Sequence, residues 1–70
     1  MSMTPERFSE CLETIGWTQR GLAARLEIDE HQTRRWASGR YPVPGPVAHW
    51  LERLTRTHER NPAPDITATA

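Results

Sequence analysis

Four polar side chains on a short stretch of the sequence could recognise the edges of nucleic-acid bases. They are His31, Gln32, Arg34 and Arg35. An arginine guanidinium can donate two parallel hydrogen bonds to guanine O6 and N7, and a glutamine amide can pair in the same way with adenine. The residue types therefore predict a base-reading set. A charged helix face that contacts only solvent is the alternative interpretation.

A helix over residues 30–38 is expected to position these side chains. Three residues that can pack inward recur three and four positions apart, namely Thr33, Trp36 and Ala37. At about 100° per residue, His31 and Arg35 then point almost directly away from the packed face. The pattern predicts a helix with an anchored inner face and a polar outer face.

Capping residues predict that this helix is the second of two, joined by a tight turn within residues 18–39. Thr18 can cap the first helix, expected over about residues 19–26, because its hydroxyl can accept a hydrogen bond from an unpaired amide. Asp29 can cap the second helix, and Gln32 follows at the spacing of a capping box. A glycine after Ser38 can end it in the left-handed conformation.

A longer series of residues follows the pattern of a known family. The residues that carry it are Thr18-Gln19, Leu22-Ala23, Leu26, Thr33-Arg34-Arg35-Trp36, Ser38-Gly39-Arg40, Pro42-Val43-Pro44, Val47, Trp50, Leu51 and Leu54. Residues 17–54 thus resemble the helix-turn-helix core of the Cro/CI (XRE-like) family of bacterial and phage DNA-binding regulators. The resemblance implies an all-α, compact, lambda-repressor-like domain of four helices, with five as the alternative.

The resemblance also implies how the chain would meet duplex DNA. The helix over residues 30–38 would enter the major groove, where the base-reading set described above would contact base edges. The residues expected at the DNA backbone are Thr18, Gln19, Arg20, Ser38, Arg40 and Tyr41. Packing of Tyr41 against the protein and a helix-dipole role for Glu30 are the alternatives at those two positions.

Two positions depart from the family pattern. Gly21 occupies a helical position where a better helix former is usual, at a cost of about 1 kcal/mol. Glu27 stands where the family usually has a glycine in the turn. Either Glu27 adopts an unfavourable backbone conformation, or the turn has a different shape.

A further helix is expected before this pair, from about Pro5 to Thr14. Thr4 is placed to cap it, the proline suits its first position, and Gly16 is placed to end it. Its buried stripe is expected to be Phe8, Cys11, Leu12 and Ile15. The cysteine on this stripe is interpreted as a small core residue and not as a nucleophile.

A last helix is expected to begin between Pro44 and Pro46 and to extend to about Glu59. If no fifth helix covers it, part of its apolar stripe would be free to contact a second copy of the chain. The expected homodimer contacts are Val47, Trp50 and Leu54, with burial in the monomer core as the alternative. Residues 1–60 would form the DNA-binding domain, and residues 61–70 lack periodicity and are expected to be a disordered tail.

Length and composition limit the classes of function. Seventy residues make one domain, and the net charge is zero. The charge is uneven, since residues 1–16 carry −2 and residues 17–40 carry +2. A single cysteine, no apolar run of membrane-spanning length and no signal peptide predict a cytoplasmic protein. No metal, cofactor or small-molecule site is predicted.

An enzyme is not expected, because the sequence offers no paired carboxylates, Cys/His pair, glycine-rich phosphate loop or metal cluster. The favoured function is a small repressor or autorepressor that binds a palindromic operator as a homodimer. By resemblance, its relatives include phage control proteins, antitoxins and autorepressors linked to anti-CRISPR genes. The alternative is an antitoxin-like or protein-interaction module that does not read DNA, which would have no reason to keep Arg20, Arg35 and Arg40.

Overall fold

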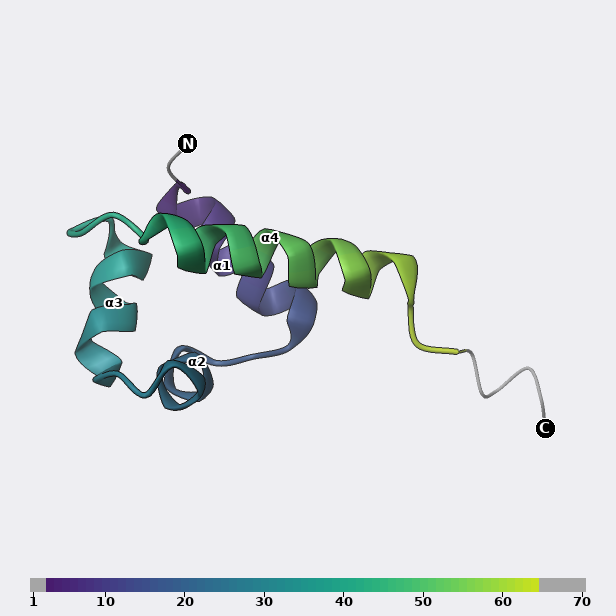
Figure 1. Ribbon diagram of the computed structural model, residues 1–70, viewed down its shortest axis with the longest axis horizontal. Helices are drawn as coiled ribbons and strands as arrows, with labels where there is room; N and C mark the ends of the chain where they lie inside the picture. Colours follow the sequence, from purple (N-terminus) through teal and green to yellow (C-terminus); the bar gives the residue numbers. More distant parts are fainter. Residues whose placement is uncertain (1–2, 65–70) are drawn as a thin grey trace.

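The computed structural model describes residues 3–64, and all the regular structure in that range is helical. The helices are α1 (Pro5–Ile15), α2 (Gln19–Leu26), α3 (Glu30–Ser38) and α4 (Gly45–Arg60). Figure 1 shows α1, α2 and α3 beside the longer α4. The prediction of an all-α chain with four helices is confirmed for this part of the protein, which contains no strand.

Local hydrogen bonds set the helix boundaries. The Thr4 hydroxyl accepts a bond from the Arg7 amide at 3.0 Å, and Pro5 occupies the first helical position. Gly16 ends α1 in the left-handed conformation, with φ 77°. Gly16 is thus the stop residue that the sequence predicted, and α1 extends to Ile15, one residue beyond the expected end at about Thr14.

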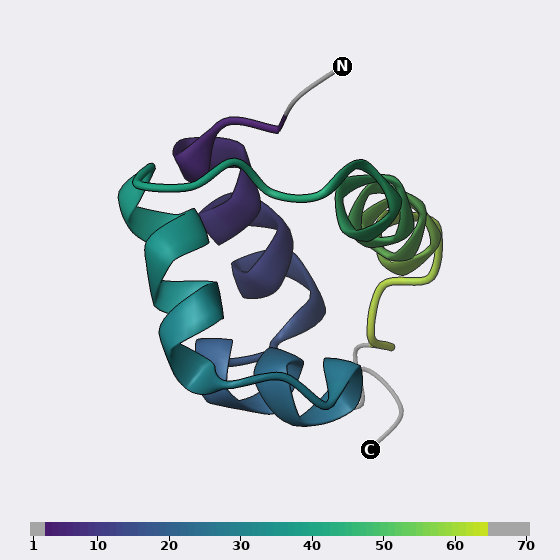
Figure 2. The ribbon, with the colours of Figure 1, turned by 60° about the vertical axis from the view of Figure 1, so that its left-hand side comes forward.

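The hydrophobic core gathers around α1, which packs against both α3 and α4, while α2 packs against α3. Figure 2 shows α1 between α3 and α4. The buried apolar residues are Phe8, Cys11, Leu12, Leu22, Ala23, Trp36, Val43, Ala48 and Leu51. The expected burial of Cys11 is confirmed, whereas Ile15 at the end of the same stripe is only half-buried.

An ion pair between the first and last helices adds to this packing. Arg7 Nε donates to Glu52 Oε2 at 2.9 Å, and Arg7 Nη2 donates to Glu52 Oε1 at 2.7 Å. These bonds from the guanidinium hold the pKa of Glu52 below its usual range. This two-pronged ion pair therefore fixes the position of the start of α1 relative to the middle of α4.

The turn between α2 and α3 resolves the question raised by Glu27. This residue lies in the left-handed region at φ 55° and ψ 45°. It is the one non-glycine residue with a positive φ in the part of the chain that the structure describes. Glu27 therefore accepts an unfavourable backbone conformation, and the turn keeps its tight shape.

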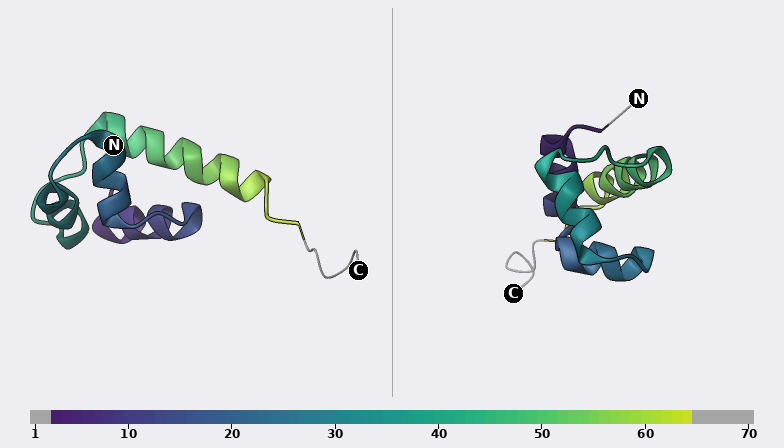
Figure 3. Two further views of the ribbon diagram at one scale, coloured as in Figure 1. Left: turned by 90° about the horizontal axis from the view of Figure 1, so that it is seen from below. Right: turned by 90° about the vertical axis from the view of Figure 1, so that its left-hand side faces the viewer.

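The carboxyl end of α4 projects beyond the shorter helices, as Figure 3 shows. Residues 61–64 that follow are exposed and have no regular structure. The rest of the predicted tail, residues 65–70, lies outside the described residues. Within the described range, no helix has the length and apolar character needed to cross a membrane.

Candidate nucleic-acid interface

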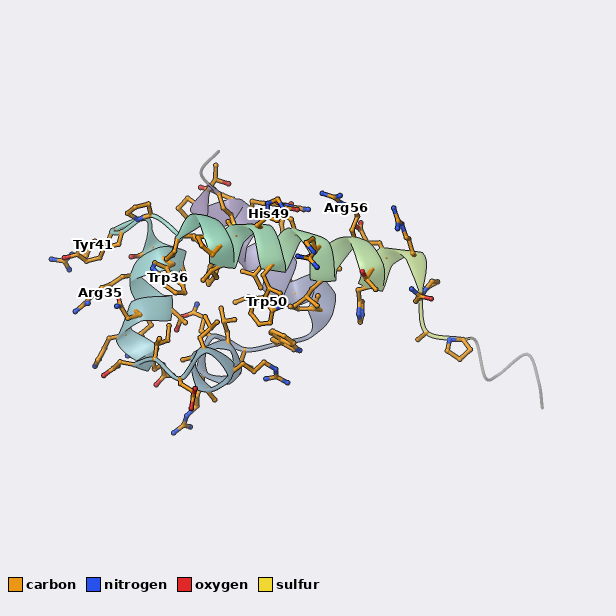
Figure 4. The ribbon with its side chains drawn as sticks, in the orientation of Figure 1. Arg35, Trp36, Tyr41, His49, Trp50 and Arg56 are labelled. Carbon is orange, nitrogen blue, oxygen red and sulfur yellow. The ribbon has the colours of Figure 1, made fainter. Side chains whose placement is uncertain are left out.

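The structure places the predicted base-reading set on one outer face of α3. Its four members, His31, Gln32, Arg34 and Arg35, are all exposed, whereas Thr33 and Trp36 on the opposite face are buried. Figure 4 shows the same division, with Arg35 pointing outward and Trp36 pointing into the molecule. The polar residues of α3 are thus accessible from outside the molecule, while its inner face is packed.

Two buried side chains fix the rotation of α3 about its axis. Thr33 is fully buried, and its hydroxyl donates to the Glu30 carbonyl at 2.8 Å. Trp36 meets Phe8 of α1 edge-on, with ring centroids 6.0 Å apart and an interplanar angle of 86°. Because an aromatic pair in this geometry resists rotation, the outer face of α3 is held in one direction.

The cap of α3 differs in one detail from the predicted capping box. The Asp29 carboxylate accepts a hydrogen bond from the His31 amide at 2.8 Å, as an N-cap should. The reciprocal bond from the Gln32 side chain is absent from the hydrogen bonds of residues 3–64. The predicted box is therefore only half formed, and the exposed Gln32 amide is left available for a ligand.

The two neighbouring arginines of α3 lie in different electrostatic surroundings. Arg34 Nη2 lies 3.6 Å from Glu30 Oε1 one helical turn earlier. Arg35 has no carboxylate within ion-pair distance in the described part of the chain, and its guanidinium carbon lies 5.5 Å from the centre of the Tyr41 ring. Among residues 3–64, the Arg35 donors therefore meet no carboxylate, whereas Arg34 lies near one.

The segment after α3 is tied back to the last turn of the helix. The amides of Arg40 and Tyr41 donate to the Arg35 carbonyl at 3.0 and 3.3 Å. The Ser38 hydroxyl donates to the same carbonyl at 3.1 Å, so its proton is already used within the chain. These bonds hold the half-exposed Tyr41 ring beside Arg35, an arrangement that helical spacing alone did not predict.

The start of α2 supplies the other residues predicted at the DNA backbone. The Thr18 hydroxyl accepts the Gly21 amide at 2.9 Å, which leaves the amides of Gln19 and Arg20 at the open end of the helix. Arg20 is exposed, and Gln19 is half-buried. Amides at a helix N-terminus together with a nearby guanidinium favour a phosphate oxygen.

The predicted dimer contacts are half-buried, and only part of each is free. The Trp50 ring lies 5.5 Å from that of Trp17, with the guanidinium carbon of Arg25 4.0 Å from the Trp17 ring centre. Val47 packs at the edge of the same core, and Leu54 is half-buried. Of the predicted dimer contacts, Leu54 borders a hollow of about 450 Å³, which is lined by Ile15, Trp17, Leu54, Thr57, His58 and Asn61.

Scans of the chain against protein-family models, curated proteins and solved structures find no match. The candidate interface therefore depends on its own residues and geometry. Within residues 3–64, no group of three or more His, Cys, Asp or Glu side chains is arranged to hold a metal ion.

Proposed function

We propose that the protein is a sequence-specific, double-stranded DNA-binding transcriptional regulator of the lambda-repressor-like type. In this proposal α2 and α3 form the helix-turn-helix, and α3 enters the major groove. The observation that carries the proposal is the outer face of α3, where Arg35 is exposed and free of carboxylate partners in the described chain. A planar guanidinium in that state suits bidentate bonds to guanine.

Within this proposal, base reading and backbone contact are divided between two sets of residues. Arg35, Gln32 and His31 would read base edges, and Arg34 would read a base or meet a phosphate. The start of α2, with Gln19 and Arg20, and the segment with Arg40 and Tyr41 would hold the sugar–phosphate backbone. Contacts of the second kind set register and orientation, and contacts of the first kind supply sequence preference.

A homodimer on a palindromic operator completes the proposal. Half-burial leaves part of the Val47, Trp50 and Leu54 side chains exposed, and Leu54 also lines a hollow. A second copy covering that surface would add to the small core of a 70-residue chain. Two subunits would then meet half-sites about 34–36 Å apart, one helical turn of DNA. Repression would follow from occupying a promoter in the cytoplasm.

Selection from a randomised duplex library, at moderate salt and with sequencing of the bound pool, tests the proposal. An enriched inverted repeat is the expected result, and its spacing gives the distance between half-sites. A single enriched half-site keeps the DNA-reading assignment and removes the dimer. Absence of enrichment by folded protein rejects sequence-specific reading and favours the protein-interaction module.

A further inference from the structure

A second positively charged surface runs along α4. Its residues are His49, Arg53, Arg56 and Arg60, and we call it the α4 basic stripe. At about 100° per residue these four positions fall within about 60° of one another on the helix. All four are exposed. The even charge balance of the carboxyl-terminal part of the sequence conceals this clustering.

The acidic residues of α4 neutralise the stripe only in part. Glu52 lies on one margin, where its carboxylate is held by both hydrogen bonds from Arg7 of α1 and also faces Arg56. Glu59 lies on the same margin and is exposed. None of the three stripe arginines forms an ion pair with the described residues. Three arginines against Glu59 leave the stripe with a positive surplus.

The dimensions of the stripe match a nucleic-acid backbone. From His49 to Arg60 it extends about 16 Å along the helix axis, at about 1.5 Å per residue. One strand of duplex DNA carries a phosphate about every 3.4 Å along its axis, so about five phosphates lie along that length. Every fixed charge of the stripe is an arginine fork, which suits phosphate oxygens.

The stripe does not lie on the face proposed for base reading. Figure 4 shows Arg35 and Tyr41 projecting from one end of the molecule, whereas His49 and Arg56 lie along the outer side of α4. A straight duplex docked against α3 would pass that end, and the stripe extends away from it. We infer that the α4 basic stripe binds the phosphate backbone of a second DNA duplex without sequence preference, so that the protein can join two duplexes.

The salt dependence of binding to a random-sequence duplex tests this inference. Each arginine that neutralises a phosphate contributes about 0.9 to the slope of log K against log salt concentration. The triple variant Arg53→Ala, Arg56→Ala, Arg60→Ala should therefore lower the slope by about 2.7. The matched triple lysine variant keeps the charges and should keep most of the slope. An unchanged slope in the alanine variant overturns the inference.

A second variant separates this inference from the proposed function. The triple variant Arg20→Ala, Arg35→Ala, Arg40→Ala removes three arginines from the proposed helix-turn-helix surface and leaves the α4 basic stripe intact. The alanine changes on α4 should lower the slope by the same amount in this background, whether or not α3 reads DNA. If the α4 alanine changes lower the salt slope in the wild-type background but not in this one, the stripe is not an independent DNA-binding surface.

Joining of two duplexes is measured directly with one duplex on beads and a second, fluorescent duplex in solution. Wild-type protein should retain the fluorescent duplex, and the α4 alanine variant should release it. Loss of slope without any joining by wild-type protein would place the stripe on the same duplex as α3 and overturn the second-duplex assignment. Binding of polyglutamate through the stripe arginines, with no binding of DNA, would also overturn the assignment and favour an acidic protein partner.

Discussion

Replacing Arg35 with alanine is the sharpest test of the proposed base-reading face. The side chain is exposed, has no ion-pair partner among residues 3–64 and points away from the buried face of α3. Its removal should therefore leave the core and the helix unchanged. Any effect on binding can be assigned to the guanidinium itself.

The expected magnitude follows from the contact that the geometry permits. A bidentate arginine–guanine pair contributes about 1–3 kcal/mol of discrimination against the wrong base. At about 1.4 kcal/mol per factor of ten, affinity for the selected operator should fall about 5- to 150-fold. Affinity for random-sequence DNA should change far less, so base preference at one position should relax.

Variants at three further positions sharpen the measurement. Arg34→Ala should cost less than Arg35→Ala, because Glu30 already lies 3.6 Å from the Arg34 guanidinium. Tyr41→Phe keeps the ring beside Arg35 and should preserve preference, whereas Tyr41→Ala should weaken it. Arg20→Ala should weaken all sequences alike and reduce the salt slope by about 1. Fluorescence anisotropy with operator and single-base variants, over a range of salt, supplies every value.

Two outcomes would refute the reasoning. If Arg35→Ala leaves both the preferred sequence and the affinity unchanged, α3 does not read bases with its outer face. If Arg34→Ala costs more than Arg35→Ala, the separation of the two arginines by their carboxylate surroundings is wrong. Circular dichroism of each variant establishes that the helices remain folded.

Stability and assembly measurements test other assignments. In urea unfolding, Glu27→Gly should stabilise the fold by about 0.5–1 kcal/mol, because glycine adopts the left-handed backbone conformation without steric strain. Glu27→Ala keeps a Cβ and should not stabilise it. Gly39→Ala should cost about 1–2 kcal/mol in the same assay, because φ is 82° and an added Cβ would lie 3.1 Å from α1. Glu52→Gln should cost about 1 kcal/mol near pH 7, since Arg7 lowers the folded-state pKa of this half-exposed carboxylate. The contribution of Glu52 to stability is present above its unfolded-state pKa and is lost as pH falls through its folded-state pKa. Wild type and Glu52→Gln should therefore have the same stability in acid. Trp50→Ala should shift sedimentation from dimer to monomer, and a monomeric wild type at tens of micromolar rejects the solution dimer.

Local sequence signals determined most of the secondary structure. At the start of three helices a side chain accepts a hydrogen bond from a backbone amide two or three residues later, namely at Thr4, Thr18 and Asp29. The start of each helix therefore depends on a few neighbouring atoms. The glycines at positions 16 and 39 end helices for an equally local reason, their freedom at positive φ. The outward direction of Arg35 also followed from helical spacing, once Trp36 was assigned to the core.

Only the tertiary structure decided the contacts between residues distant in sequence. Glu27 adopts a left-handed backbone because α2 and α3 must pack closely, and its residue type argues against that conformation. The sequence left the burial of the α4 apolar stripe open, and the structure places the Trp50 ring 5.5 Å from the Trp17 ring with part of Trp50 still exposed.

The charge of α4 shows the same division. Helical spacing alone brings its arginines to one face, but only the packed structure shows that the Glu52 carboxylate accepts its hydrogen bonds from Arg7, 45 residues away. Capping and helical periodicity act over one or two turns and can be predicted from neighbouring residues. Ion pairing and burial depend on which helix faces meet, and that is settled only when the whole chain packs.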